Sequence, residues 1–161
     1  MYKIHTISVK EILENSFENE VFLRYDLVIK YMFIDTFMKK KKLKKKFERF
    51  KLYHLLYLDK SPESAVKHHR RFIPIIKSFA EKGYDMMYPL HMSRQYHLQG
   101  GSHRLSCCLW FDIYEVPIVF IEGGWTDRKR RYTKKWMKKH KFRNHIKKID
   151  AVKNQILKNH L

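Results

Sequence analysis

The chain has 161 residues, 44% of them hydrophobic and 15% aromatic, which supports a single folded domain over residues 1–161 and excludes a disordered basic tail. Its 35 basic residues against 16 acidic ones give a formal net charge of +19, which favours polyanionic partners such as nucleic acid, an acidic membrane surface or phosphorylated small molecules. Two adjacent cysteines, Cys107 and Cys108, give neither a disulfide framework nor a metal-ligand spacing, and no stretch approaches the roughly 20 apolar residues that cross a bilayer, so we expect a cytoplasmic protein.

The N-terminal part is predicted to form one strand followed by basic helices, with a helical elaboration over residues 21–55. Short alternation over residues 2–9 predicts an edge strand. Apolar residues at spacings of three and four over residues 21–37 favour a helix, although a strand within this stretch stays open. We interpret the basic run Lys39–Lys46 as a continuation of that helix with one strongly positive face. This face is a candidate surface for nucleic acid or an anionic membrane, and solvated lysines explain it equally well.

A helix with clear start and stop signals follows. Ser61 is a good cap and Pro62 fits the first helical position, while Gly83 is a plausible end. Pro74 inside the pattern predicts a kink or two shorter helices. The tetrapeptide His68–Arg71 lies on this helix, where neighbouring side chains point about 100° apart, so surface or phosphate contacts fit it better than zinc.

The next segment is predicted to alternate between strands and a helix. Residues 88–92 and 96–98 read as short strands, and residues 118–121 as a third strand entered from Pro117. Between them, Gly100 and Gly101 break the second strand and Ser102 is expected to cap a helix that runs to Phe111. The last part, residues 125–161, is a basic helical extension in which Trp125, Tyr132 and Trp136 are interpreted as core or lid aromatics. Its amphipathic helix carries the following apolar residues at spacings of four, three, three and four: Phe142, Ile146, Ile149, Val152 and Ile156.

The segment Gln99–Arg104 is the candidate functional centre. Glycines let the backbone turn sharply and let an anion approach without a Cβ in the way. The first amides of a helix lack internal partners and carry positive partial charge, so they accept phosphate oxygens. Arg104 offers a planar fork for phosphate, and His103 can donate a hydrogen bond or move a proton near neutral pH. The predicted phosphate-binding residues are Gly100, Gly101, Ser102, His103 and Arg104.

Residues 96–119 resemble the core motif of the ParB/sulfiredoxin-like superfamily, in which a strand ends in a glycine-containing turn with an arginine and a helix then leads into a Val-Pro strand. The likeness extends over about residues 61–122. It implies an α+β fold with a small mixed sheet surrounded by helices, and nucleotide binding through the glycine turn. Sulfiredoxins carry Gly-Gly-Cys-His-Arg, so the serine at Ser102 removes the thiol chemistry.

Two other branches of the superfamily also differ from this chain. The free-serine kinases carry an acidic residue where this chain has Gly100, so another carboxylate would have to hold Mg²⁺ or take the substrate proton. Asp59 and Glu63 are the candidates, because members of the superfamily place functional acids before the first helix of the core. ParB proteins bind CTP through a Gly-Glu-Arg-Arg motif, of which Gly101 and Arg104 remain here.

From this resemblance we expect a nucleotide-dependent phosphotransferase that moves phosphate from ATP or ADP, with Mg²⁺, to a small polar acceptor such as a sugar or an amino alcohol. CTP is a further possible nucleotide. The catalytic candidates are His103, Asp59 and Glu63, and no metal site made by protein ligands is predicted. The alternatives are a basic ParB-like nucleic-acid-binding protein and a nucleotide sensor without catalysis. The sequence does not indicate an oligomeric state.

Overall fold

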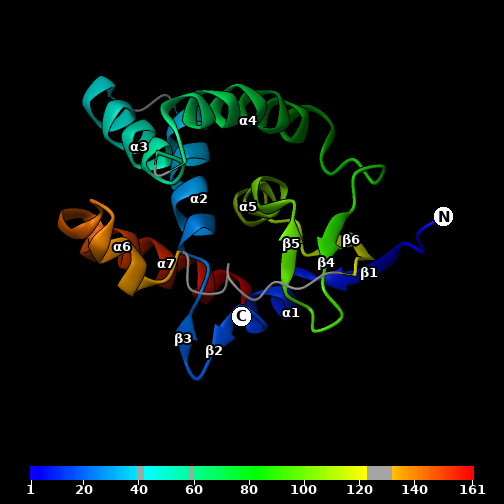
Figure 1. Ribbon diagram of the computed structural model, residues 1–161. Helices are drawn as coiled ribbons and strands as arrows, with labels where there is room; N and C mark the ends of the chain where they lie inside the picture. The colour runs from blue at the N-terminus through cyan, green and yellow to red at the C-terminus, as the bar shows by residue number, and fades with distance from the viewer. Residues whose placement is uncertain (40–41, 59, 123–131) are drawn as a thin grey trace.

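The computed structural model describes residues 1–39, 42–58, 60–122 and 132–161, and within them one small mixed sheet has four strands (Figure 1). In sheet order they are β1 (His5–Ser8), β6 (Glu115–Phe120), β4 (Leu90–Met92) and β5 (Leu98–Gly100). β6 runs antiparallel to β1 and parallel to β4, and β5 runs antiparallel to β4. The predicted α+β class with a small mixed sheet is therefore confirmed, as is the N-terminal edge strand.

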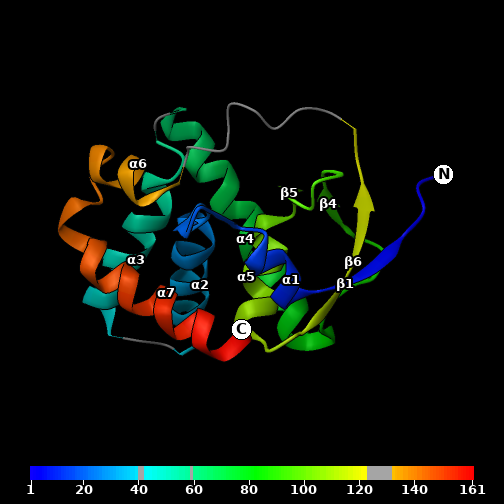
Figure 2. The same ribbon diagram turned by 90° about the horizontal axis from the view of Figure 1, so that it is seen from below.

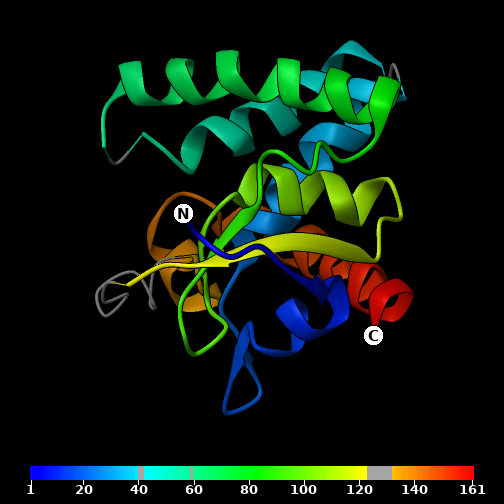
Figure 3. The ribbon, with the colours of Figure 1, turned by 90° about the vertical axis from the view of Figure 1, so that its right-hand side faces the viewer.

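Helix α5 (Ser102–Trp110) connects β5 to β6 and covers one face of the sheet. Its buried side includes both cysteines. Helix α4 (Pro62–Lys82) lies over α5 on the side away from the sheet, as Figure 3 shows with β6 and β1 beneath α5. α1 (Val9–Glu14) and the hairpin of β2 (Phe17–Glu18) and β3 (Val21–Phe22) lie at the margin. The glycine turn between β5 and α5 is thereby placed at a junction of sheet and helices.

Helix α2 (Tyr25–Met38) is the centre of the helical part, and Figure 2 shows it passing between α3 and α5. Most of its residues are buried because it contacts helices on several sides. The helix expected over residues 21–37 thus begins four residues later, since Val21 and Phe22 pair as a strand. A helix that is apolar on nearly every side can be stable only when it is surrounded.

The basic run Lys39–Lys46 does not continue α2, so that prediction is wrong. α2 ends at Met38, and α3 (Leu43–Leu55) is a separate helix that packs back against it. The ring of Phe33 lies 4.6 Å from Tyr53, between ring centres. α3 has a single apolar face. This face can pack against α2 only if the chain reverses direction between the two helices.

α4 is one uninterrupted helix, which excludes the two shorter helices that Pro74 suggested. Ser61 caps it as predicted, with its Oγ accepting a hydrogen bond from the Ser64 amide at 3.0 Å. Gly83 ends it at a φ of +73°. The helix continues through the proline because its buried face, which includes Phe72 and Ile76, packs across that position.

The C-terminal part is helical as predicted, with α6 (Lys134–Lys139), a 3-10 turn η1 (Arg143–His145) and α7 (Ile146–His160). α7 packs against α2, and the Tyr25 hydroxyl donates to Asp150 at 2.5 Å. Trp125 lies outside the described residues, whereas Tyr132 and Trp136 are partly buried and pack edge to face. Of the predicted apolar stripe, four residues are buried and Val152 is partly buried; the four are Phe142, Ile146, Ile149 and Ile156.

Candidate functional site

The glycine turn joins the end of β5 to the start of α5. Gly101, rather than Ser102, is the N-cap residue, and its φ of +93° lies in the left-handed region that favours glycine. The prediction that Ser102 caps the helix is therefore wrong, because Ser102 is already the first helical residue. A Cβ at Gly101 would lie 2.5 Å from Cδ2 of Leu90, a residue buried in the sheet. The turn thus needs glycine for both its conformation and its packing.

We expect Gly101→Ala to lower the free energy of unfolding by roughly 2–4 kcal/mol, the sum of backbone strain and overpacking. Gly83→Ala is the matched control, because Gly83 also has a positive φ and a Cβ there meets nothing within 4 Å. It should cost about 1 kcal/mol from strain alone. Urea unfolding of both variants measures the difference, and equal losses would contradict the packing argument.

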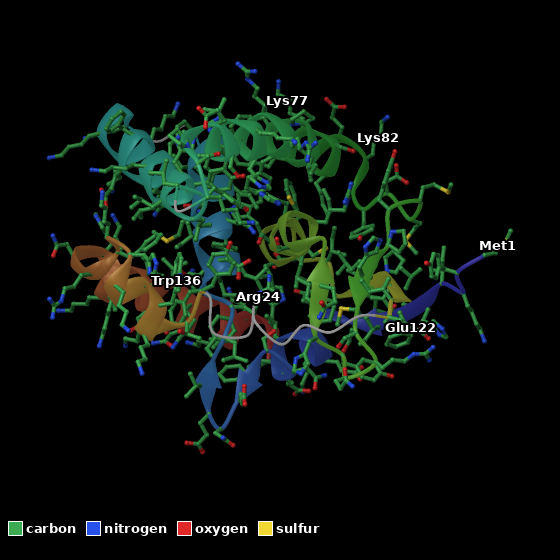
Figure 4. The ribbon with its side chains drawn as sticks, in the orientation of Figure 1. Met1, Arg24, Lys77, Lys82, Glu122 and Trp136 are labelled. Atoms are coloured by element: carbon green, nitrogen blue, oxygen red, sulfur yellow. The ribbon has the colours of Figure 1, made fainter. Side chains whose placement is uncertain are left out.

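A cavity of about 210 Å³ opens directly in front of this turn. The start of α2, the segment that follows α3, the first half of α4 and the turn itself contribute to its walls. Figure 4 shows Arg24 where the chain enters α2, whereas Lys77 and Lys82 project outward from α4. The described lining residues are Arg24, Asp26, Lys30, Tyr57, Lys60, His68, Leu98, Gln99, Gly100, Ser102, His103 and Tyr132.

Three buried charged side chains form one wall of the cavity. Arg24 donates two hydrogen bonds to the carboxylate of Asp26, each 2.9 Å long. Lys30 Nζ lies 3.2 Å from the same carboxylate, and the side chains of Asp26 and Lys30 are only 1% and 2% exposed. Burial alone would raise the pKa of Asp26, but the charges of Arg24 and Lys30 hold that pKa well below its usual range. Asp26 is therefore a carboxylate at all physiological pH values.

Lys30 connects this group to the glycine turn. Its Nζ lies 2.6 Å from Oγ of Ser102, which is half-buried and faces the cavity. Burial lowers the pKa of Lys30, an effect that Asp26 opposes and Arg24 increases. The group thus places the amine of Lys30 beside the first turn of α5.

Histidine and tyrosine rings form the opposite wall. His103 Nε2 shares hydrogen bonds with the hydroxyls of Tyr53, at 2.8 Å, and Tyr57, at 3.3 Å. The ring of His68 stacks on Tyr57 at 3.9 Å between centres. Burial, together with the charge of Lys30, lowers the pKa of His68 to about 4 and lowers that of His103 well below the ordinary value. Both imidazoles are therefore neutral near pH 7, and His103 lies at the cavity as predicted.

The guanidinium of Arg104 lies away from the cavity. It stacks over the ring of Tyr88, 4.8 Å from its centre, and lines a separate groove of about 190 Å³ with Asp85 and Pro74. Four of the five predicted phosphate-binding residues flank the cavity: Gly100, Ser102 and His103 line it and Gly101 lies between them. Only the backbone of Arg104, in the first turn of α5, stays beside them.

The predicted acidic residues do not join this cavity within the described part of the chain. Glu63 is exposed at the start of α4 and lines a shallow groove with Lys67, Arg70 and Arg71. Asp59 lies outside the described residues. Among those described, no three His, Cys, Asp or Glu side chains are placed to hold a metal ion. Asp26 does not fit Mg²⁺ either, because Arg24 and Lys30 already occupy its oxygens.

The lysine run lies apart from the cavity lining. Lys39 pairs with Asp35 at 2.9 Å, while Lys42, Lys44 and Lys45 are exposed at the start of α3. Residues 40–41 lie outside the described part. Within that part, no helix is both long and apolar enough to cross a bilayer.

Sequence reasoning missed the wall that α2 contributes. Asp26 and Lys30 do leave a signal, because two charged residues four positions apart interrupt an otherwise apolar helix. The pairing of Lys30 with Ser102, 72 positions later, leaves none. Comparisons with family models, with curated proteins and with solved structures find no match to this chain.

Proposed function

We propose that the protein is a nucleotide-binding phosphotransferase of the ParB/sulfiredoxin-like fold, which moves phosphate from ATP or ADP to a small polar acceptor. The observation that carries the proposal is the cavity at the glycine turn, where the guanidinium of Arg24 and the amine of Lys30 line the same space as the first turn of α5. Basic side chains beside the first amides of a helix favour a phosphate group over a neutral ligand.

The connectivity around the turn supports the fold proposal. β5 leads through Gly101 into α5, and α5 leads into β6, which contains Pro117 and runs parallel to β4. This is the succession of strand, glycine turn, helix and Val-Pro strand on which the resemblance rests. The superfamily uses such a turn for nucleotide phosphates, and the same use is proposed for residues 100–104.

The size of the cavity indicates how a nucleotide would bind. Pockets that enclose drug-sized ligands measure roughly 300–1,000 Å³, and this cavity of about 210 Å³ is smaller. It can hold the terminal phosphate and the hydroxyl of a small acceptor, while the nucleoside lies outside. His103, the predicted proton acceptor, presents a neutral imidazole there, and Tyr57 and Gln99 offer hydrogen bonds to a polar acceptor.

Thermal unfolding with ATP, ADP, CTP and GTP, each with and without Mg²⁺, tests the proposal. A nucleotide at 100 times its dissociation constant should stabilise the protein by about 2.7 kcal/mol. Lys30→Met should abolish that shift, because it removes the amine that lies beside Ser102 at the start of α5. Arg104→Ala should leave most of it, because that guanidinium lies over Tyr88. Transfer is then measured as ADP or AMP release in the presence of sugars and amino alcohols.

The two alternatives predict different results in the same assay. A nucleotide sensor would show the thermal shift but no acceptor-dependent release. A nucleic-acid-binding protein would show no shift with any nucleotide and would bind DNA with an affinity that falls steeply with salt. The exposed lysines at the start of α3, Lys42, Lys44 and Lys45, would be its surface. The absence of a shift would overturn the phosphotransferase proposal.

A further inference from the structure

Ser102 and Lys30 lie close together, an arrangement that the sequence did not predict. Their Oγ and Nζ atoms are 2.6 Å apart, and both residues line the cavity. Ser102 is the one aliphatic hydroxyl among the described lining residues. A second serine on α5, Ser106, is buried and donates to the Ser102 carbonyl at 2.8 Å. The only serine placed to react with a ligand in the cavity is thus the one beside Lys30.

The surroundings of Lys30 allow it to accept a proton. The side chain of Lys30 is only 2% exposed, and the neighbouring guanidinium of Arg24 does not deprotonate in proteins, so Lys30 is the cation of this group that can lose its proton. Loss of that proton leaves the doubly hydrogen-bonded Arg24–Asp26 pair in place. The lowered pKa of Lys30 agrees with this arrangement. Among the described residues, several titratable or charged groups line the cavity with Lys30. They are Arg24 and Asp26 before and on α2, Tyr57 and Lys60 after α3, His68 on α4, His103 on α5, and Tyr132.

We propose that Ser102 is the nucleophile of the phosphotransferase and that Lys30 is the general base that activates it, so that the phosphoryl group passes through a phosphoserine; this inference rests on the function proposed above. Ser102 Oγ attacks the terminal phosphorus of a nucleoside triphosphate, and the new Oγ–P bond forms while the P–O bond to the nucleoside diphosphate breaks. The hydroxyl proton moves to Nζ of Lys30, and the resulting ammonium pairs with the phosphoserine. The first amides of α5 stabilise the same phosphate.

The second half-reaction regenerates the pair. The acceptor hydroxyl attacks the phosphoserine, the Oγ–P bond breaks, and Lys30 returns its proton to Oγ. The acceptor's own proton passes to the neutral imidazole of His103, the proton acceptor named above, and from there to solvent. The reaction involves no oxidation or reduction, and its only co-substrates are the nucleoside triphosphate and the acceptor.

Covalent labelling tests the intermediate. The wild-type chain is incubated with ATP and Mg²⁺ and analysed by intact mass, and the modified peptide is sequenced by fragmentation. We expect one added phosphoryl group on Ser102, formed faster as the pH rises through the lowered pKa of Lys30. Ser102→Ala and Lys30→Met should reduce labelling at least tenfold. Ser78→Ala, in a partly exposed serine of α4, is the matched control and should label normally. Labelling on another residue, or undiminished in Lys30→Met, would overturn the proposal.

A second measurement needs no nucleotide. In Ser102→Cys, the introduced thiol is alkylated with iodoacetamide as a function of pH, against a silent background because Cys107 and Cys108 are buried and burial raises the pKa of Cys108 to about 12. We expect a thiol pKa clearly below the ordinary value of about 8.5, and a higher one when Lys30→Met is added. An ordinary thiol pKa would overturn the activation of Ser102. Lys30→Arg, which keeps the cation but cannot act as a base, should keep the low thiol pKa and lose labelling.

The nucleotide-induced thermal shift distinguishes a failure of the covalent step from a failure of nucleotide binding. If the shift is present but no phosphoserine forms, the nucleotide-binding function stands and the covalent step is wrong. If no nucleotide shifts the unfolding temperature, both proposals are wrong. Circular dichroism of Lys30→Met checks its fold, which we expect to persist because the Arg24–Asp26 pair remains.

Discussion

Asp26→Asn is expected to lower the free energy of unfolding by about 3–5 kcal/mol, one of the two largest effects that the structure predicts. The substitution keeps the shape of the side chain but removes the only anion of the buried group. Arg24 and Lys30 would then both lose the buried carboxylate that they contact. Removing one partner of a buried ionic group is costly because the remaining charges have lost both water and their partner. Urea unfolding at neutral pH measures the loss.

Lys30→Met is expected to cost clearly less than Asp26→Asn, because it leaves Arg24 and Asp26 as a neutral, doubly hydrogen-bonded pair. Adding Lys30→Met to Asp26→Asn should restore part of the lost stability, which a double-mutant cycle detects. Asp85→Asn, in an exposed loop, is the control and should change the stability little. Equal losses of unfolding free energy for the two single variants would show that the net charge of the group does not determine its contribution to stability.

The second large effect is a loss of stability on mild acidification. Burial lowers the pKa of His54, His68, His69 and His103 in the folded protein below the ordinary value of 6.5. The unfolded chain therefore binds more protons than the folded one between the lowered values and 6.5. Stability is complete above about pH 6.5 and falls as the pH decreases; for His68 the window extends to about pH 4.

Each histidine that stays neutral in the folded state contributes up to about 1.4 kcal/mol per pH unit, and the partly exposed rings contribute less because solvent screens them. Urea midpoints between pH 7 and pH 5 measure the slope, a range chosen because the carboxylates with lowered pKa values, such as Asp26, stay ionised there. His103→Gln should flatten the slope, since the pKa of this partly buried ring lies well below the ordinary value. His91→Gln, in an exposed position, should not. A stability that is constant over this range would contradict the burial of these rings in neutral form.

The parts of the site that the sequence could predict are local in the chain. Gly101 sits at a left-handed turn that only a few neighbouring residues determine, and the pattern of glycines, Ser102 and His103 before an apolar helix is visible without knowing the rest of the fold. The caps of α4 are local in the same sense. Ser61 and Gly83 act within one helical turn of their own positions.

The parts that could not be predicted depend on the packing of distant segments. No glycine or proline marks the break between α2 and α3. The helix ends there because the apolar face of α3 packs back against α2. The direction of Arg104 is set by its contact with Tyr88, which no spacing rule reveals. The charged wall of the cavity comes from residues more than 70 positions before the glycine turn.

The hydrogen bond between Lys30 and Ser102 also has a consequence for how the site comes into being. During synthesis, the residues of α2 are added long before Ser102. Lys30 can therefore form this hydrogen bond only after α3, α4 and most of the sheet have been synthesised. A contact of such long sequence separation forms late and is lost early when the chain loosens. The region that resembles a known superfamily, residues 61–122, holds the glycine turn but none of the cations on α2. Cut out by itself, it would retain the motif and lack the charged side chains of Arg24, Asp26 and Lys30 that line the cavity.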